Sequence, residues 1–308
     1  MPVMPEEEAE YSAFVQTQVA TLKCLDFDKD QLLWHYTTGD ALLSIIESGA
    51  LFSTQVSCLN DSTEARYGSN VMREAILELL REVSLSTPGA RESIERYSAA
   101  SAEDPAVPSS APSYWFVTCF SGNEDDLSQW RAYSGGENGY AIGFRASTLF
   151  GHPNSLLVRV NYDGAQHRAV ARDIAKTMFD FYRKGVERRG VGAAEQWASE
   201  FFPAFSLMVD NLAPMVKHSA FRSEGEYRIV HHLQDHEMAR VKFKQKATLM
   251  SRHFPLTFAG SPMLPISRVM IGPSRHKAIT RVSVDMALRQ RGYSAGLVWQ
   301  SEIPYQQT

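Results

Sequence analysis

The stretch Trp34-His35-Tyr36-Thr37 leads through three residues into Ala41-Leu-Leu-Ser-Ile-Ile-Glu-Ser-Gly49, and it sets our prediction of the fold. The aromatic residues predict a short strand over 31–36, and the apolar spacing that follows predicts a compact helix ending at Gly49. His35 then lies beside the N-terminus of a helix, where exposed N–H groups and the helix dipole favour anions. A strand and a helix in this order can hold the ribose and phosphates of a nucleotide.

The residues after this helix predict a second strand. Thr37 or Thr38 can cap the helix, and residues 51–58 then alternate between apolar and polar side chains. Ser53 lies with two other polar residues on one side of this alternation. We expect this polar face to line a cleft.

The remaining segments predict strands and helices in irregular order, with several spacings that suit hairpins. We therefore expect an α+β fold with a mixed or antiparallel, split β-core and flanking helices. Residues 1–30 are interpreted as an N-terminal helical extension and 31–308 as a single α+β domain, with a flexible insertion near 84–113. Further strands are predicted at 114–120, 140–144, 156–162, 226–233, 239–244, 266–271 and 296–300, and further helices at 8–22, 62–83, 125–133, 165–186, 192–213 and 274–291.

The composition is typical of a soluble globular protein, with 44% hydrophobic and 21% charged residues. No stretch approaches the ~20 apolar residues of a membrane span, and the first residues lack the features of a signal peptide. The three cysteines, Cys24, Cys58 and Cys119, are dispersed, which favours a reducing compartment. We expect a cytoplasmic protein without a membrane partner. Neither the Rossmann nor the P-loop glycine motif occurs in the chain.

The charges are unevenly distributed along the chain. The formal net charge is −4, yet residues 217–308 carry 14 Lys and Arg against 6 Asp and Glu. A segment with this excess of positive charge can bind the phosphates of a cofactor or of a nucleic acid. We favour the interpretation that the charges are uneven by chance over the interpretation that this segment is dedicated to binding nucleic acid. Lys242, Lys244 and Lys246 share one face of a strand, where lysines can also protect an exposed edge from aggregation.

Glu226 is the carboxylate that we consider for catalysis. It begins the strand predicted at 226–233, and strand alternation places Arg228 on the same face. One interpretation is a structural ion pair between these two side chains. The other is a carboxylate that stabilises the positive charge building on the anomeric carbon of a ribose. Glu224 is an alternative on the same face, and we prefer Glu226 by its position.

His35 is the first candidate for nucleotide binding. A lone histidine at the end of a strand is most often a buried side chain with its hydrogen bonds satisfied. Three polar residues and the start of a helix follow it, namely Tyr36, Thr37 and Thr38 and the helix after them. Because of them, a role in binding is supported about as well as a structural role. Both interpretations stay open.

The helix predicted at 125–133 is the second candidate. Aromatic faces suit stacking on nicotinamide or adenine, and a guanidinium can hold a pyrophosphate through two hydrogen bonds. The alternative is a helix whose Trp lies in the core and whose Arg pairs with Asp125 or Asp126. We slightly favour binding, because the helix is more polar than a core helix needs to be. Its candidate residues are Gln129, Trp130, Arg131 and Tyr133.

We predict no metal site. His231 and His232 point to opposite faces of a strand, and neither a cysteine nor a second histidine pair completes a ligand set. Cys119 can act as a nucleophile only with a base nearby, and the sequence supplies none. A buried strand cysteine is the favoured interpretation.

Seven short motifs lie along the chain, from about residue 31 to residue 305. The motifs are Trp34-His35-Tyr36-Thr37, Leu59-Asn60-Asp61 with Glu64, Cys119-Phe120-Ser121, Leu127-Ser128-Gln129-Trp130-Arg131-Ala132-Tyr133, Tyr140-Ala141-Ile142-Gly143-Phe144, Glu226-Tyr227-Arg228 and Ile271-Gly272-Pro273. They resemble the motifs of a bacterial domain-of-unknown-function family, number two-nine-seven-one (DUF2971). Together they are specific for this family, whereas most of them are weak singly.

The first segment of this family is similar to the start of ADP-ribosyltransferase-like folds. These folds include toxins that modify DNA and the RNA phosphotransferase that uses NAD. The resemblance implies that His35 holds the ribose of NAD, that Ser53 lines the nicotinamide pocket and that Glu226 is catalytic. The usual Tyr or Ser-Thr-Ser motif has no clear counterpart, and the alternatives for it are Tyr67, Gln129 and Tyr133.

The expected function is transfer of ADP-ribose from NAD to a macromolecule, in the setting of a toxin or of phage defence. NAD is then a substrate, and the acceptor is a protein, DNA or RNA. Two alternatives stay open: a non-catalytic module that binds a nucleotide or nucleic acid, and an NAD glycohydrolase. The expected site residues are Glu226 and His35 for catalysis and, for NAD, His35, Tyr36, Thr37, Ser53, Gln129, Trp130, Arg131 and Tyr133.

Overall fold

The computed structural model describes residues 10, 13–14, 16–18, 20–59, 62–82, 115–134, 139–150, 154–209, 213–245, 249–258 and 263–304. The insertion expected near 84–113 lies outside the described residues. The chain groups into two compact units: a helical unit of Met1–Leu25, Val56–Ser113 and Val160–Phe221, and a sheet unit of Asp26–Gln55, Tyr114–Arg159 and Arg222–Thr308. The division into an extension over 1–30 and a single domain over 31–308 stays a prediction.

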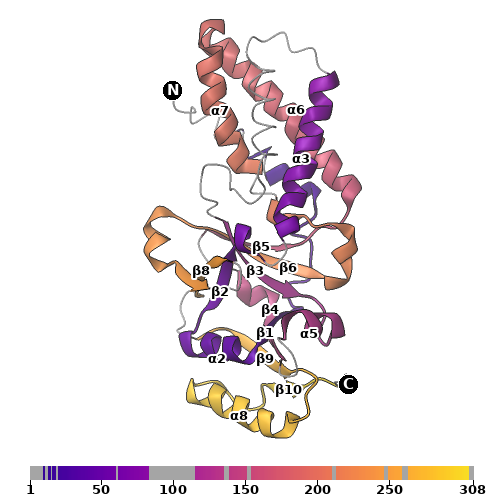
Figure 1. Ribbon diagram of the computed structural model, residues 1–308, viewed down its shortest axis with the longest axis vertical. Coiled ribbons are helices and arrows are strands. Elements are labelled where there is room, and N and C mark those ends of the chain that lie inside the picture. The colour runs from indigo at the N-terminus through magenta and orange to yellow at the C-terminus, as the bar shows by residue number, and fades with distance from the viewer. Residues whose placement is uncertain are drawn as a thin grey trace. The chain divides into compact units, whose positions relative to one another are not determined.

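The helical unit contains three long helices among its described residues: α3 (Ser62–Glu82), α6 (Gly164–Arg189) and α7 (Ala194–Val209). In Figure 1, α6 runs beside both α3 and α7. Asp163 caps α6, because its side chain accepts hydrogen bonds from the N–H groups of Ala165 and Gln166. None of the helices in the described part of the chain combines the length and apolar character that a membrane crossing needs.

The sheet unit contains ten strands among its described residues. They are β1 (Leu32–Thr38), β2 (Leu51–Gln55), β3 (Trp115–Ser121), β4 (Gly139–Arg145), β5 (Ser155–Arg159), β6 (Glu226–His232), β7 (Lys242–Gln245), β8 (Met250–Leu256), β9 (Ile266–Ile271) and β10 (Val298–Gln300). Helices of this unit are α2 (Gly39–Ser48), α5 (Leu127–Tyr133) and α8 (Lys277–Gln290), and 3₁₀ helices include η2 (Ala146–Leu149) and η6 (Asp235–Arg240).

The strands form one open, mostly antiparallel sheet. Their hydrogen-bonded order is β10-β9-β4-β1-β3-β2-β8-β7, and β6 joins this path by pairing with β3 and β5. β9 and β10 pair in parallel, and the other strand pairs are antiparallel. The prediction of helices combined with a mixed or antiparallel sheet is therefore confirmed.

The sheet divides at β3. At one edge of β3, β6 pairs with it along its whole length, from Trp115 to Ser121. At its other edge, β3 pairs with β1 at Ser121 and with β2 at Phe116 and Val117. Cys119 therefore lies between the points where β1 and β2 join β3.

The two faces of the sheet pack on different helices. Cross-strand partners share a face, and neighbouring residues of one strand lie on opposite faces. The core face carries Leu33, Phe120 and Tyr227, which pack with residues of α2 and α8 in the larger apolar cluster. The opposite face carries Glu226 and, on β1, Trp34, which packs with α5 in a smaller cluster. We name this second face the Glu226 face.

The opening stretch of the chain folds as predicted. α2 begins after Thr38, whose side chain accepts a hydrogen bond from the N–H of Ala41. It ends at Gly49, which adopts the left-handed conformation with φ at 61°. The first strand and the helix predicted here are confirmed, and a second strand follows them.

Other local predictions are wrong. The strand expected over 51–58 ends at Gln55 and continues as a 3₁₀ helix. Its polar face does not line an open cleft, because Ser53 and Gln55 have exposed fractions of 0% and 3%. β8, which pairs with both β2 and β7, has no counterpart among the predicted strands.

Candidate functional site

The register of the sheet separates His35 from Glu226. Trp34 pairs with Ser121, and Ser121 pairs with Glu226, so these three residues share the Glu226 face. His35 follows Trp34 in β1 and therefore lies on the core face. The structure does not bring the two expected catalytic residues together on one face.

His35 forms a hydrogen bond with a main-chain carbonyl group. Its Nδ1 lies 2.9 Å from the carbonyl oxygen of Cys119. A carbonyl only accepts, so Nδ1 carries the hydrogen and, in the neutral ring, Nε2 is the acceptor. Burial lowers the pKa of His35, and the hydrogen bond to Cys119 only partly opposes this. The geometry favours a neutral imidazole that ties β1 to β3 at the point where the sheet divides.

Thr37 and Ser53 lie on the same core face as His35. Thr37 pairs with Tyr140 and has an exposed fraction of 7%. Ser53 is fully buried, and its Oγ lies 2.6 Å from Oγ1 of Thr118 in β3. These two cofactor candidates are therefore enclosed in the sheet unit, and the hydroxyl of Ser53 already has a partner there.

Glu226 and Arg228 form a buried ion pair. Nε of Arg228 donates to Oε1 of Glu226 at 2.7 Å, and Nη2 donates to Oε2 at 2.8 Å. The exposed fractions of the Arg228 and Glu226 side chains are 3% and 7%. Two parallel hydrogen bonds of this kind favour the ionised carboxylate. The structural ion pair is therefore present, and a catalytic role for Glu226 stays a prediction.

Tyr36 lies on the Glu226 face and connects β1 to the segment before α5. Its ring meets Trp130 edge-on, with ring centroids 4.7 Å apart. Its hydroxyl oxygen lies 2.8 and 2.7 Å from the carbonyl oxygens of Asn123 and Glu124, which share its single hydrogen, and it accepts from the N–H of Asp126 at 3.2 Å. Burial raises the pKa of Tyr36, so the phenol keeps its proton.

Hydrogen bonds also fix the start of α5. Partial burial works to raise the pKa of Asp126, but hydrogen bonds from Ser128, Gln129 and Asn123 hold it below its ordinary value. Oδ1 of Asp126 accepts from the N–H and the hydroxyl of Ser128, at 2.7 and 2.6 Å. Asp126 is therefore the cap of this helix.

α5 divides its candidate residues between the interior and the solvent. Gln129 and Trp130 are buried, and Nε1 of Trp130 donates to Asp125 at 2.7 Å. Arg131 and Tyr133 are exposed. Of the four candidates on this helix, these last two are the ones that a ligand can reach without displacing core residues.

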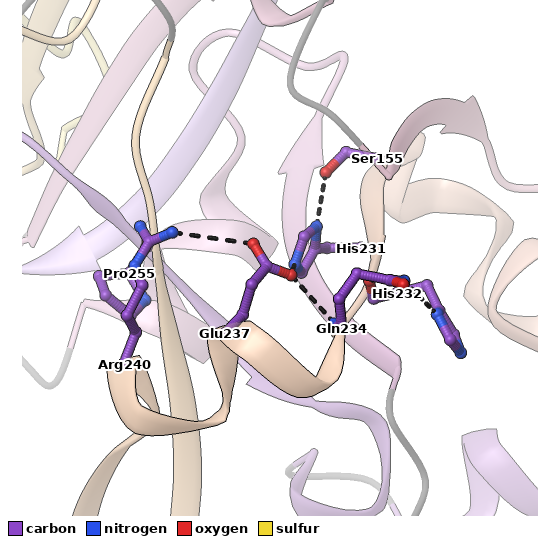
Figure 2. Close-up of polar contacts among 7 residues, drawn as sticks. All are labelled: Ser155, His231, His232, Gln234, Glu237, Arg240 and Pro255. Carbon is purple, nitrogen blue, oxygen red and sulfur yellow. Dashed lines mark hydrogen bonds and ion pairs between the residues drawn. The ribbon is translucent and has the colours of Figure 1, made fainter.

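A second polar cluster lies on the core face at the far end of β6 (Figure 2). His231 is fully buried, and its Nδ1 lies 2.8 Å from Oγ of Ser155 in β5. Its Nε2 lies 3.1 Å from Oε2 of Glu237 in η6. The imidazole stacks on Phe254, with ring centroids 4.6 Å apart. We name Ser155, His231 and Glu237 the His231 network.

Glu237 is held in this network from several sides. Its Oε2 accepts from the N–H of Gln234 at 3.0 Å, and its Oε1 lies 3.7 Å from Nη1 of Arg240 (Figure 2). Partial burial works to raise the pKa of Glu237, but the hydrogen bond from Gln234 and the interaction with His231 hold it below its ordinary value. The carboxylate is therefore ionised at neutral pH.

The order serine, histidine, carboxylate is that of a catalytic triad. From the sequence, we consider His231 only as a metal ligand. The network becomes apparent only from the pairing of Ser155 with His231 across β5 and β6. Because the imidazole is fully buried and stacked on Phe254, the geometry favours a structural network that joins β5, β6 and η6.

His231 and His232 do not form a metal-binding pair. His232 lies on the Glu226 face, and its Nδ1 accepts from Nε2 of Gln234 at 2.9 Å. Within the described ranges, no group of three or more His, Cys, Asp and Glu side chains is arranged to hold a metal ion.

The folded protein should lose stability as the pH falls below about 6.5, in part through His35. Burial lowers the pKa of His35 below its ordinary value of 6.5, so on acidification the unfolded chain binds a proton before the folded chain does. This contribution is complete above pH 6.5 and decreases as the pH falls toward the lowered pKa. Thermal unfolding between about pH 7.5 and about pH 5.5 measures it as a decreasing Tm.

His35→Asn is the control for this pH dependence. The asparagine amide can still donate to the Cys119 carbonyl, but it does not titrate. The variant should show a shallower decrease of Tm, although His167 and His232, whose pKa values burial also lowers, still contribute. An unchanged slope in His35→Asn would contradict the assignment.

Residues 129–229 match the model of a family described as "Protein of unknown function (DUF2971)". The matched segment begins in α5, ends in β6 and contains Glu226 and Arg228. It covers about a third of the chain, and over that segment it agrees with the resemblance described above. No curated protein and no solved structure matches the chain.

Proposed function

We propose that the chain acts on NAD and transfers ADP-ribose to a macromolecule, with Glu226 as the catalytic carboxylate. The observation that carries this proposal is the buried carboxylate at the start of β6, held by two hydrogen bonds from Arg228. As the nicotinamide–ribose bond breaks, positive charge builds on the anomeric carbon. A fixed, ionised carboxylate in a poorly solvated place stabilises such a charge more than water does.

The reaction that we propose is a substitution at the anomeric carbon. The electron pair of the broken carbon–nitrogen bond leaves with nicotinamide. A lone pair of the acceptor forms the new bond to the same carbon, and the proton of the acceptor passes to solvent. Glu226 stabilises the ribosyl cation between these events, and Arg228 keeps the carboxylate in place.

The sheet register changes which residues we assign to NAD. Glu226 shares its face with Tyr36 and, through α5, with Trp130. In the proposal the exposed Arg131 contacts the pyrophosphate, and Tyr133, which is also exposed, stacks on a ring of NAD. His35 is then a positioning residue, because it lies on the opposite face.

Adenine-labelled NAD, incubated with the purified protein and cell lysate, tests the proposal. We expect label in one of the protein, DNA and RNA fractions. Glu226→Gln should lower the labelling at least about 100-fold, because losing one charge-stabilising group of this kind costs about 2.7–4 kcal/mol of barrier. Glu237→Gln is a matched control, since it removes another buried carboxylate of the sheet unit and should retain the activity.

Folding must be separated from catalysis in this experiment, because Glu226→Gln leaves the buried Arg228 without its anion. The double variant Glu226→Gln with Arg228→Met removes both charges and should fold, yet stay inactive. Free ADP-ribose without a labelled acceptor would indicate an NAD glycohydrolase. Intact NAD in every reaction would contradict the proposal and leave a non-catalytic module.

A further inference from the structure

The hairpin of β7 and β8 exposes an aromatic side chain at the edge of the sheet. β7 ends the path of hydrogen-bonded strands in the described part of the chain. All four of its residues are exposed, and Phe243 has an exposed fraction of 65%. Met250, at the start of β8, is 61% exposed. An exposed apolar edge of this kind indicates either a binding surface or a site of aggregation that neighbouring charges must protect.

The same hairpin lies in a long segment without acidic residues. Between Met238 and Val284 the chain has nine Lys and Arg and no Asp or Glu. Within the described ranges, Lys242, Lys244 and Arg252 form no ion pair with a carboxylate. Positive charge that the protein itself does not neutralise attracts polyanions.

The register of the hairpin places a stacking group beside a cation. Phe243 pairs directly with Arg252, so the aromatic ring and the guanidinium share a face. Lys242 and Lys244 lie on the other face of the same edge strand, and both are exposed. Proteins that bind single strands combine these groups, because bases stack on the aromatic rings and cations follow the phosphates.

We propose that the β7–β8 hairpin binds single-stranded nucleic acid. An unpaired base stacks on Phe243, and Lys242, Lys244 and Arg252 contact the phosphates around it. A duplex is the poorer ligand, because its bases are already stacked on one another and offer no free face to Phe243. This proposal does not depend on any reaction at Glu226. If the lysines only protect the edge, the hairpin binds no ligand.

Fluorescence anisotropy with labelled oligonucleotides of about 12 nucleotides tests this proposal on the full chain. The probes are oligo-dT, oligo-U and a mixed-sequence duplex. We expect the single strands to bind more tightly than the duplex, and the two single strands show whether DNA or RNA is preferred. With three phosphate contacts, the slope of log K against log salt should be about −2 for a single strand.

Lys242→Gln with Lys244→Gln should make this slope shallower by about 1.4, because each lost phosphate contact accounts for about 0.7. Lys176→Gln with Lys184→Gln removes two exposed lysines of α6 instead, and it should change neither slope nor affinity. Equal effects of the two lysine pairs would overturn the proposal, since binding would then depend on net charge alone.

Phe243→Ala should weaken binding of the single strands about tenfold and leave binding of the duplex nearly unchanged. The side chain is exposed, so this variant should fold like the parent protein. No binding of either single strand, tighter binding of the duplex, or an unchanged affinity in Phe243→Ala would each overturn the proposal.

Discussion

Replacing Arg228 with methionine is expected to destabilise the protein by about 3–5 kcal/mol. The side chain of Arg228 is 3% exposed and donates two hydrogen bonds to the carboxylate of Glu226. Methionine retains much of the apolar length of the side chain but leaves a buried carboxylate without its cation. The cost of removing that carboxylate from water is then no longer offset. Urea unfolding followed by tryptophan fluorescence measures the change.

Two further variants separate the buried ion pair from a general effect of removing an arginine. Glu226→Gln combined with Arg228→Met removes both charges and should regain most of the lost stability, which a double-mutant cycle quantifies. Arg183→Met breaks the exposed pair of Arg183 with Asp180 on α6 and should cost less than about 1 kcal/mol. Similar costs for Arg228→Met and Arg183→Met would show that Glu226 is not buried in solution.

The start of the fold could be predicted because its signals are local. Thr38 caps α2 through a hydrogen bond to an N–H three residues away, and Gly49 ends the helix in the left-handed conformation. Asp126 caps α5 in the same local way. Each of these signals lies within a few residues of the structure that it determines, so a single segment of sequence is enough.

The faces of the strands could not be predicted in the same way. β1 is buried on both faces, so its sequence does not alternate, and it does not show whether Trp34 or His35 shares a face with Glu226. That assignment needs the pairing with Ser121, 87 positions along the chain. Ser53 is similar, because its hydroxyl is satisfied by Thr118 in another strand.

The His231 network and β8 depend even more on distant residues. Ser155 and His231 are 76 positions apart and meet only because β5 pairs with β6. β8 mixes polar residues, a proline and buried Phe254 without a regular alternation, and it is a strand because β2 and β7 both pair with it. Tertiary pairing, which a single sequence does not display, determines these elements.

Trp34→Ala is expected to lower the free energy of unfolding by about 3–5 kcal/mol. The side chain is 1% exposed and packs in the smaller apolar cluster of the Glu226 face. Truncation leaves a cavity that its rigid neighbours fill only in part. Trp299→Ala is a matched control, because Trp299 is 49% exposed and its loss should cost much less.

Gly143 makes the same experiment a test of the register of β1. Gly143 pairs with Trp34, and a Cβ at Gly143 would lie 2.9 Å from the indole ring. Gly143→Ala alone should therefore cost about 1–3 kcal/mol, whereas in the Trp34→Ala background the added methyl group enters the space that the ring has left. Additivity of the two changes to within about 0.5 kcal/mol would show that they do not touch. The register that places Trp34 on the Glu226 face and His35 on the core face would then be wrong, because a slip of one residue exchanges these two side chains.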